Sequence, residues 1–324
     1  MTDIFFERPK EGEPWDVCII GSGPSSFTAS IYTSRGAAST LVIAGDVWGG
    51  QLMLTTEVDN FPGFPEGVLG PELMQKMRSQ AERFKVEIVD KRATEIDFGK
   101  SPFEIHAGDK AYFARSLILA TGAETRWLGV PGEEKLLGRG VSSCAPCDAP
   151  FFKNKKVAVV GGGDSAMEEA LVLTKYASEV VIIHRRSEFR ASAAMQAKVK
   201  QNSKIRILWN TEVAELIGES KLEKIKLKSS VDSQESELNL DGVFVAIGHS
   251  PATDIYKGKI KLDEKGYVVR YEKEGFRSAT SVPGVFVAGD VHDTHYKQAI
   301  TAAGFGCMAA LDTLKYLDKD MPAY

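Results

Sequence analysis

Residues 16–36 read DVCIIGSGPSSFTASIYTSRG, and this stretch decides the fold class. The apolar run 17–20 predicts a strand, which meets the turn Gly-Ser-Gly and then a helix-compatible segment. Gly21 permits the tight turn, and Gly23 lets the backbone approach a pyrophosphate at the helix N-terminus. Ser26 stands where glycine or alanine is usual, so we expect slightly looser packing of helix on strand. The pattern predicts a dinucleotide-binding unit.

A second stretch repeats this arrangement. Residues 155–190 read KKVAVVGGGDSAMEEALVLTKYASEVVIIHRRSEFR, with a strand running into Gly161-Gly162-Gly163, Ala166 at the third motif position, and a second strand ending at Ile183. Each glycine turn lies between a predicted strand and a predicted helix, which is the context the motif requires. The sequence therefore predicts two dinucleotide folds of the α/β class.

The two units differ in the residues after their second strands. An NAD site has an acidic residue there for the ribose 2′-hydroxyl, whereas the second unit has His184, Arg185, Arg186 and, a turn later, Arg190. Guanidinium groups bind a 2′-phosphate through charge-assisted bonds, which indicates NADP. The alternative is a solvated basic helix start, but the position of the run favours the cofactor. The first unit has no acid directly after its strand 41–43, so it is not a plain NAD site.

Two further segments belong with the first unit. SLILATGA (116–123) predicts a buried strand, and SVPGVFVAGDV (281–291) predicts a strand that presents Asp290 where it could bind a cofactor hydroxyl. Because the second of these lies near the C-terminus, the first domain is split and the second is inserted within it. The expected domains are residues 1–125 and 251–324 for the first, and 126–250 for the second.

Composition narrows the remaining possibilities. The 324 residues are enough for two domains. A net charge of −4 gives no reason to expect a nucleic-acid or anionic-membrane partner, and no apolar run approaches the length of a membrane span. The charged N-terminus, residues 1–16, does not resemble an export signal, so we expect a cytoplasmic protein. Of the four cysteines, Cys18 and Cys307 lie in apolar or small-residue runs and are expected to be buried, inert thiols.

The other two cysteines, Cys144 and Cys147, lie in SSCAPCDAP (142–150). This pair could be a metal site, an incidental loop feature or a redox dithiol. A structural zinc site needs four ligands, and no second Cys or His cluster has zinc-like spacing, so no metal is expected. The position between two nucleotide-binding units favours redox chemistry. Asp148 is the candidate proton donor and acceptor, with a simple turn or helix-start residue as the alternative.

Taken together, these motifs resemble the low-molecular-weight thioredoxin reductases from Asp16 to about Tyr316. The resemblance rests on GGQLMLTTEVDNFPGFP, ATG, Cys-x-x-Cys-Asp, GGGDSA, HRRSEFRA, AIGHSP and AGDVHDTHYKQAITAAGFGCMAAL. It implies two Rossmann-like, three-layer ββα domains, of which the split domain binds FAD and the inserted domain binds NADPH. It also implies a homodimer.

The resemblance also implies the binding residues. Asp290 is expected at the ribityl chain, and Gln298 and Ala299 at the edge of the flavin ring. The full FAD set is Gly21, Ser22, Gly23, Pro24, Ser25, Gly50, Gln51, Asn60, Thr121, Gly122, Asp290, Lys297, Gln298 and Ala299. The NADPH set is Gly163, Asp164, Ser165, His184, Arg185, Arg186, Arg190, Ile247 and Gly248.

In such an enzyme NADPH reduces FAD, which reduces the Cys144–Cys147 disulfide. The resemblance places Cys147 toward the flavin, while Cys144 attacks the disulfide of a thioredoxin-like protein. Since the dithiol and the NADPH turn share the inserted domain, one flavin cannot readily meet both in a fixed arrangement. We therefore expect the inserted domain to rotate.

Departures from the family pattern leave other functions open. Pro146 and Ala149 replace the usual Thr and Gly around the dithiol, and proline offers no N–H to a thiolate. Lys297 replaces an arginine. The alternatives are a related flavin disulfide reductase or dithiol oxidase with another partner, and a slow flavoprotein redox sensor. The HRRSEFR run favours NADPH over reduced ferredoxin as the donor.

Overall fold

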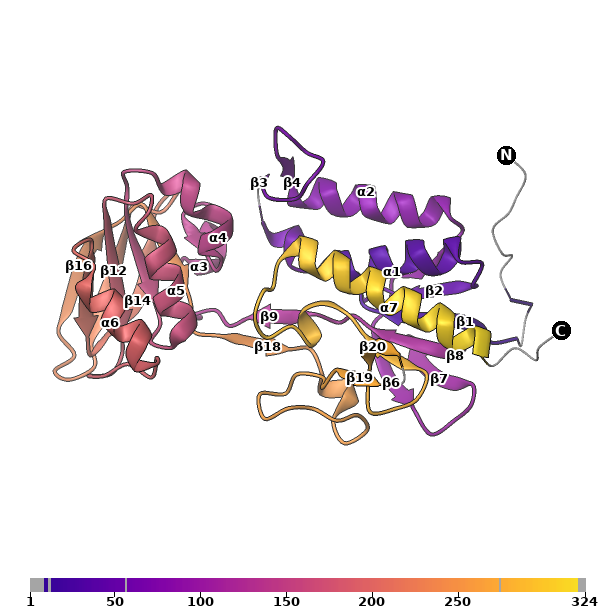
Figure 1. Cartoon of the computed structure of the whole chain (residues 1–324). Helices are drawn as coiled ribbons and strands as arrows, with labels where there is room; N and C mark the ends of the chain where they lie inside the picture. Colours follow the sequence, from indigo (N-terminus) through magenta and orange to yellow (C-terminus); the bar gives the residue numbers. More distant parts are fainter. Residues whose placement is uncertain (1–8, 11–12, 56, 274, 320–324) are drawn as a thin grey trace. The chain divides into compact units, whose positions relative to one another are not determined.

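The computed structural model describes residues 9–10, 13–55, 57–273 and 275–319. These residues form two compact units, one from the described residues up to Glu124 together with those from Ser250 onward, and the other from Thr125–His249. The two chain crossings between the units, β9 (Ala123–Thr125) and β18 (His249–Pro251), pair as a two-stranded sheet (Figure 1). The second unit therefore enters and leaves the first at adjacent points.

The first unit is built on one sheet, with strand order β19-β20-β21-β8-β1-β2-β5. The strands from β21 to β5 run parallel, and β6 and β7 continue from β8 as an antiparallel hairpin. Their bounds are β1 Trp15–Ile20, β2 Thr40–Ile43, β5 Glu87–Val89, β6 Ala93–Asp97, β7 Phe103–Ala107, β8 Lys110–Leu119, β19 Tyr271–Lys273, β20 Phe276–Ala279 and β21 Val285–Val287. The remaining elements of this unit are α1 Pro24–Arg35, η1 Gly50–Leu54, β3 Glu57–Val58, β4 Val68–Leu69, α2 Gly70–Arg83, η3 Asp254–Tyr256, η4 Gly289–Val291 and α7 Ala299–Lys319.

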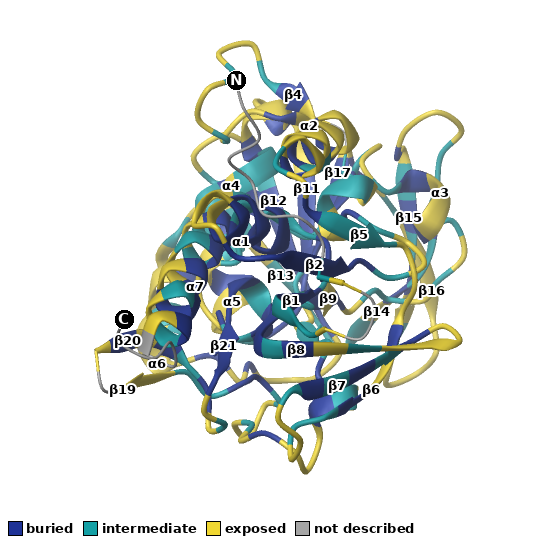
Figure 2. Ribbon diagram, turned by 90° about the vertical axis from the view of Figure 1, so that its right-hand side faces the viewer, coloured by how far each residue is buried: buried dark blue, intermediate teal, exposed yellow. Residues whose placement is uncertain are grey.

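Both faces of this sheet are covered, which explains why β1 is apolar throughout. Val17 and Ile19 pack with the helices α1, α2 and α7, whereas Cys18 and Ile20 pack with the residues of β6 and β7 on the other face. Figure 2 colours strand β2, which lies between β1 and β5, dark blue, since all of its residues are buried. The unit thus has three layers, helices, parallel sheet and antiparallel strands (Figure 1).

The second unit repeats the three layers at smaller size. Its parallel sheet has the order β10-β17-β11-β12-β13, and β14-β15-β16 form a separate antiparallel sheet. Alternate residues of β11 again divide between the two faces, toward α5 and toward β14 and β15. The bounds are α3 Glu133–Leu136, β10 Val141–Ser142, α4 Ala145–Asp148, η2 Ala149–Phe152, β11 Lys156–Val160, α5 Asp164–Leu173, β12 Glu179–His184, α6 Ala193–Gln201, β13 Ile205–Trp209, β14 Thr211–Ile217, β15 Lys224–Ser229, β16 Glu235–Asn239 and β17 Gly242–Val245.

The two glycine turns are held in the same way. Gly21 has a φ of 125°, and a Cβ there would lie 2.1 Å from the carbonyl oxygen of Ala120. At Gly161 a Cβ would lie 2.4 Å from the carbonyl oxygen of Ala246. In each unit the turn presses against the end of the neighbouring parallel strand, so only glycine is accommodated. The prediction of two Rossmann-like units is confirmed.

Two smaller expectations are wrong. Ser26 does not loosen the packing of α1, because it is fully buried and its hydroxyl donates to the Gly21 carbonyl at 2.6 Å. Cys18 is buried as expected, and burial raises the pKa of its thiol. Cys307, however, is partly exposed on α7 and hydrogen bonds with the hydroxyl of exposed Tyr32. Within the described ranges no helix combines the length and the apolar character that crossing a membrane requires.

Candidate active site

Each glycine turn leads into a helix with open space in front of it. Gly23 precedes α1 and Gly163 precedes α5, and at neither position would a Cβ meet another atom within 4 Å. Neither helix start is capped by a side chain. The backbone N–H groups of a helix N-terminus bind phosphate groups. Both turns therefore have the space and the donors that a dinucleotide pyrophosphate requires.

Serine side chains fix the first turn. The Ser22 hydroxyl donates to the Ala44 carbonyl at 2.7 Å and accepts the Gly49 N–H at 3.0 Å. Ser25 is buried, and a Cβ at Gly289 would lie 2.6 Å from its Oγ. Pro24 occupies the first position of α1, where its missing N–H costs no helical bond. These contacts tie the turn to the segments on either side of it.

The other residues predicted for FAD come from three segments of the first unit. Gly50 and Gln51 begin η1, and a Cβ at Gly50 would lie 3.5 Å from the Cα of Gly23. Gly122 has open space around its Cα. The Thr121 side chain forms a hydrogen bond within the protein, because its hydroxyl donates to the Ala252 carbonyl at 2.7 Å.

Asp290 lies in η4 with one carboxylate oxygen, Oδ1, buried and without a hydrogen-bond partner among the described residues. Burial and, to a smaller extent, nearby Asp293 raise the pKa of Asp290 to about 7, while Lys297 acts in the opposite direction. A buried acceptor without a donor is costly. The hydroxyl groups of a bound ribityl chain would supply such donors, so this atom fits an FAD site.

The loop that precedes α7 is held by Asp293. Its carboxylate accepts the N–H groups of His295, Tyr296 and Lys297, each at 2.9 Å. Lys297 adopts a φ of 49° in this loop, and its ammonium lies over the ring of Tyr267. Sequence reasoning missed Asp293, whose role depends on these backbone bonds.

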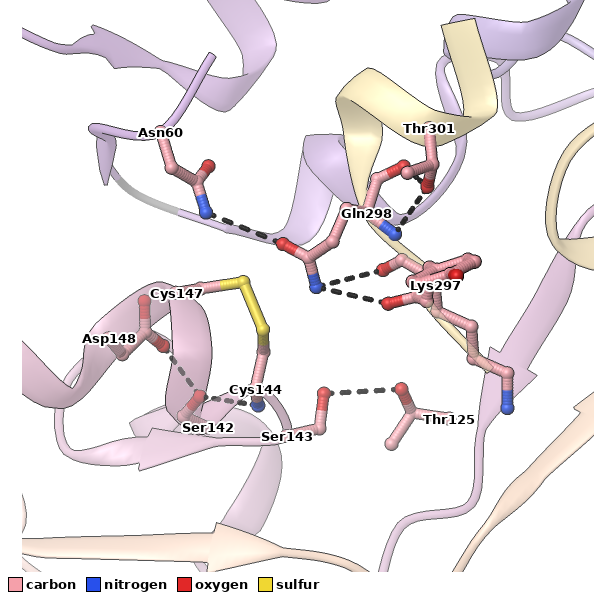
Figure 3. The surroundings of a disulfide bond; sticks show 11 residues. Asn60, Thr125, Ser142, Ser143, Cys144, Cys147, Asp148, Lys297, Gln298 and Thr301 are labelled. Atoms are coloured by element: carbon pink, nitrogen blue, oxygen red, sulfur yellow. Dashed lines mark hydrogen bonds between the residues drawn. A yellow bond between two sulfur atoms is a disulfide. The ribbon is translucent and has the colours of Figure 1, made fainter. Parts of the chain in front are cut away.

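Gln298 follows this loop and Ala299 begins α7. The Gln298 side chain donates to the Tyr296 and Lys297 carbonyls and accepts from Asn60 Nδ2 at 3.4 Å (Figure 3). Its backbone N–H donates to Thr301 Oγ1 at 3.2 Å. The structure thus brings Asn60 and Gln298 together, although they are far apart in the sequence.

Three arginines lie near the second turn. Arg185, Arg186 and Arg190 are all exposed, and none forms an ion pair within the ranges that the structure describes. The N–H groups of Arg190 and Ala191 donate to the Gly162 carbonyl at 2.8 and 3.1 Å. These bonds hold the basic segment beside the glycine turn, as a clamp for a 2′-phosphate would require.

His184 and Asp164 support this segment from within the protein. The His184 ring is buried, bonds to the Glu188 carbonyl at 2.9 Å, and would meet a Cβ at Gly162 at 2.2 Å. Its pKa is lowered, chiefly by burial. Asp164 accepts the Ser192 N–H and hydroxyl at 2.9 and 2.8 Å. Their binding of NADPH stays a prediction, as does that of exposed Ser165.

Beyond the end of β17, Ile247 is exposed and Gly248 has a φ of 110°. The Gly248 carbonyl accepts the Arg126 N–H at 3.0 Å, while a Cβ at Gly248 would meet nothing within 4 Å. This segment therefore leaves room for a ligand, and its predicted role in NADPH binding stays a prediction.

Cys144 and Cys147 form a disulfide across the short helix α4, with their Cα atoms 5.3 Å apart (Figure 3). Cys144 is the N-cap of α4, and the N–H groups of Cys147 and Asp148 donate to its carbonyl at 3.2 and 3.1 Å. Among the described residues no group of three or more His, Cys, Asp or Glu side chains is placed to hold a metal ion. The pair is thus a disulfide on a helix start.

Ser142 connects this disulfide to Asp148. Its hydroxyl donates to Asp148 Oδ2 at 2.5 Å and accepts the Cys144 N–H at 3.1 Å. Burial raises the pKa of Asp148, and the bond from Ser142 partly offsets this effect. Asp148 is the N-cap residue of the following η2 but makes no side-chain cap bond to it, and its role as proton donor and acceptor stays a prediction. Sequence reasoning missed Ser142, because serine is common in loops.

Comparisons with known proteins agree with this geometry. The family described as pyridine nucleotide-disulphide oxidoreductase matches residues 15–306. The chain is 49% identical to the thioredoxin reductase of Mycolicibacterium smegmatis, covering 93% of this chain and 96% of that protein. It is 48% identical to the thioredoxin reductase of Rickettsia conorii, covering 94% and 98%.

Solved structures give the same result. The thioredoxin reductase from Giardia duodenalis superposes with a TM-score of 0.90 at 40% identity, covering 94% of this chain and 99% of that chain. The thioredoxin reductase from Streptococcus pyogenes superposes with a TM-score of 0.88 at 36% identity, covering 94% and 98%.

Proposed function

The chain belongs to the thioredoxin reductases of the pyridine nucleotide-disulphide oxidoreductase family, and from this premise we propose that it is an NADPH-dependent thioredoxin-disulfide reductase. The observation that carries the proposal is the Cys144–Cys147 disulfide with Asp148 and Ser142 beside it. This disulfide shares a unit with a glycine turn beside which three exposed arginines lie.

The family uses FAD and NADPH, and residues of this chain fit both. When bound, FAD supplies the two-electron chemistry that connects a nicotinamide to a disulfide. We assign its pyrophosphate to the first glycine turn, its ribityl chain to Asp290 and its ring to the segment at Gln298. We assign NADPH to the second turn, with its 2′-phosphate held by Arg185, Arg186 and Arg190.

The dithiol performs thiol–disulfide exchange. The Cys144 thiolate attacks the disulfide of a thioredoxin-like partner, which forms a mixed disulfide and releases one partner thiolate. The Cys147 thiolate then attacks the Cys144 sulfur, which releases the second partner thiolate and restores the Cys144–Cys147 bond. Each released thiolate takes up a proton. Asp148, whose raised pKa favours the protonated form, is placed to hold that proton beside Cys147.

We further propose that the inserted unit rotates during turnover, because both the dithiol and the NADPH turn belong to it and must act on one flavin. The paired crossings β9 and β18 are the natural hinge. We also propose a homodimer in the cytoplasm. Exposed Tyr32 on α1 and Leu311 on α7 support an interface on the helical side of the first unit.

The decisive experiment is steady-state NADPH oxidation with a thioredoxin-like protein and a disulfide dye as the final acceptor. We expect turnover that depends on the partner protein. The Cys147→Ser variant should lose it while NADPH still bleaches the flavin. Oxidation no faster than the background reaction of the flavin with oxygen would overturn the proposal in favour of a redox sensor. Partner-dependent turnover that survives in Cys147→Ser would overturn the role of the dithiol.

A further inference from the structure

Glu169 is a half-buried acid that the exchange chemistry above does not use. It lies on α5, which packs against α4, the helix of the dithiol. Its carboxylate accepts the N–H of Ala145. One carboxyl oxygen, Oε2, is buried and has no hydrogen-bond partner in the part of the chain that the structure describes. The hydrogen bond that the described structure gives this carboxyl is therefore one with the backbone next to Cys144.

The hydrogen bonds of α4 show why this contact matters. The Cys147 and Asp148 N–H groups both donate to the Cys144 carbonyl, and Pro146 has no N–H to donate. Ala145 supplies the remaining amide of this turn, and its partner is Glu169. Glu169 therefore fixes the backbone beside Cys144 from a neighbouring helix, since α4 itself is only four residues long.

The charges around Glu169 oppose its ionisation. Burial, with smaller contributions from Asp148 of α4 and Glu168 of α5, raises its pKa to about 8, although the bond from the Ala145 N–H acts in the opposite direction. Of the described elements packed against α5, namely α4, α6, η2, β11 and β12, none brings a cation that acts on this carboxyl. Around neutral pH the group is the uncharged acid, and in weakly alkaline solution it becomes an anion close to the dithiol.

We propose that Glu169 is a positioning residue of the dithiol, which fixes the backbone beside Cys144 and, through its own ionisation, sets the negative charge around the thiolate that forms there. The inference rests on the proposed function for its role in turnover. A second carboxylate near a thiolate disfavours the thiolate and raises the pH at which the thiol ionises. A neutral Glu169 holds the helix start without this effect.

The test compares Glu169→Gln and Glu169→Ala with Glu168→Gln, a matched control on the neighbouring, exposed position of α5. The reduced flavoprotein is treated with iodoacetamide from about pH 6 to about pH 10, and alkylation of Cys144 is followed by mass spectrometry. The amide of Glu169→Gln still accepts the Ala145 N–H and never ionises. Below about pH 7 we expect Cys144 of Glu169→Gln to be alkylated at the same rate as Cys144 of the unsubstituted protein. At higher pH the variant should react faster, by up to about tenfold near pH 9, so that the midpoint of its pH profile lies up to about one pH unit lower. Glu168→Gln should shift the midpoint much less.

Turnover gives a second readout. Glu169→Ala leaves the Ala145 amide without an acceptor, so kcat with the partner protein should fall about tenfold, while NADPH-dependent flavin bleaching is unchanged and Glu169→Gln restores kcat. The inference is overturned if Glu169→Gln and the unsubstituted protein give the same pH profile of Cys144 alkylation. It is also overturned if Glu168→Gln shifts the midpoint of that profile as far as Glu169→Gln does. Alkylation needs no partner protein, so it decides this point even if the unsubstituted protein fails to reduce thioredoxin.

Discussion

At the scale of single residues, Asp290 is the clearest sign that the first unit binds a polyhydroxyl ligand. Its buried Oδ1 has no partner among the described residues, and burial, together with Asp293, raises its pKa to about 7. Because this pKa is above the ordinary value, the folded protein binds more protons than the unfolded chain between about pH 4 and pH 7. The contribution of Asp290 to stability is therefore present at low pH and is lost as the pH rises through about 7.

We predict that the same residue makes FAD affinity depend on pH. If ribityl hydroxyls donate to Asp290, FAD binds the ionised form, so affinity should rise about tenfold between about pH 6 and pH 8. Quenching of flavin fluorescence on titration of the apoprotein measures this, with Asp290→Asn as the variant in which the rise disappears. A rise of equal size in Asp290→Asn would show that another group controls the affinity.

At the scale of elements, residue roles that depend on the neighbouring sequence can be predicted, whereas roles that depend on tertiary contacts cannot. Gly21 and Gly161 could be predicted, because a strand followed by a glycine turn and a helix leaves a recognisable pattern. Ser142 and Glu169 could not, since their roles arise only when β10 and α5 are brought beside α4. His184 lies between these cases, because its position in the motif was recognised but the burial of its ring against Gly162 was not.

The segment after β12 carries the prediction about cofactor choice. Arg185→Ala and Arg190→Ala should each weaken NADPH binding by about 1.5–3 kcal/mol, the free energy of a hydrogen bond to a charged group, with little change for NADH. Dissociation constants of both nucleotides, measured by fluorescence, check this. Arg206→Ala is the matched control, because Arg206 is an exposed arginine of β13 in the same unit that pairs with Glu179. Equal losses for NADPH and NADH would contradict a 2′-phosphate clamp.

At the scale of the whole molecule, the chain uses one architecture twice. Each unit has a parallel sheet with helices on one face and antiparallel strands on the other, and each has its own two core clusters. The apolar patterns of the strands indicated both sheets. The antiparallel layers were expected only through the family resemblance, because β14, β15 and β16 are rich in charged residues and leave a weak pattern. An inserted unit with a complete core and adjacent ends has the features that independent folding requires.

We therefore predict that the fragment 123–251, which retains both crossing strands, folds alone, because the Arg126 N–H still bonds to the Gly248 carbonyl at 3.0 Å and closes its ends. Thermal unfolding followed by circular dichroism should show one cooperative transition. NADPH at about 100 times its dissociation constant should stabilise the fragment by about 2.7 kcal/mol and raise its Tm by several degrees, whereas FAD should leave Tm unchanged. A fragment without a cooperative transition would show that its core needs the first unit, and a Tm that rises with FAD would contradict the assignment of the two nucleotides.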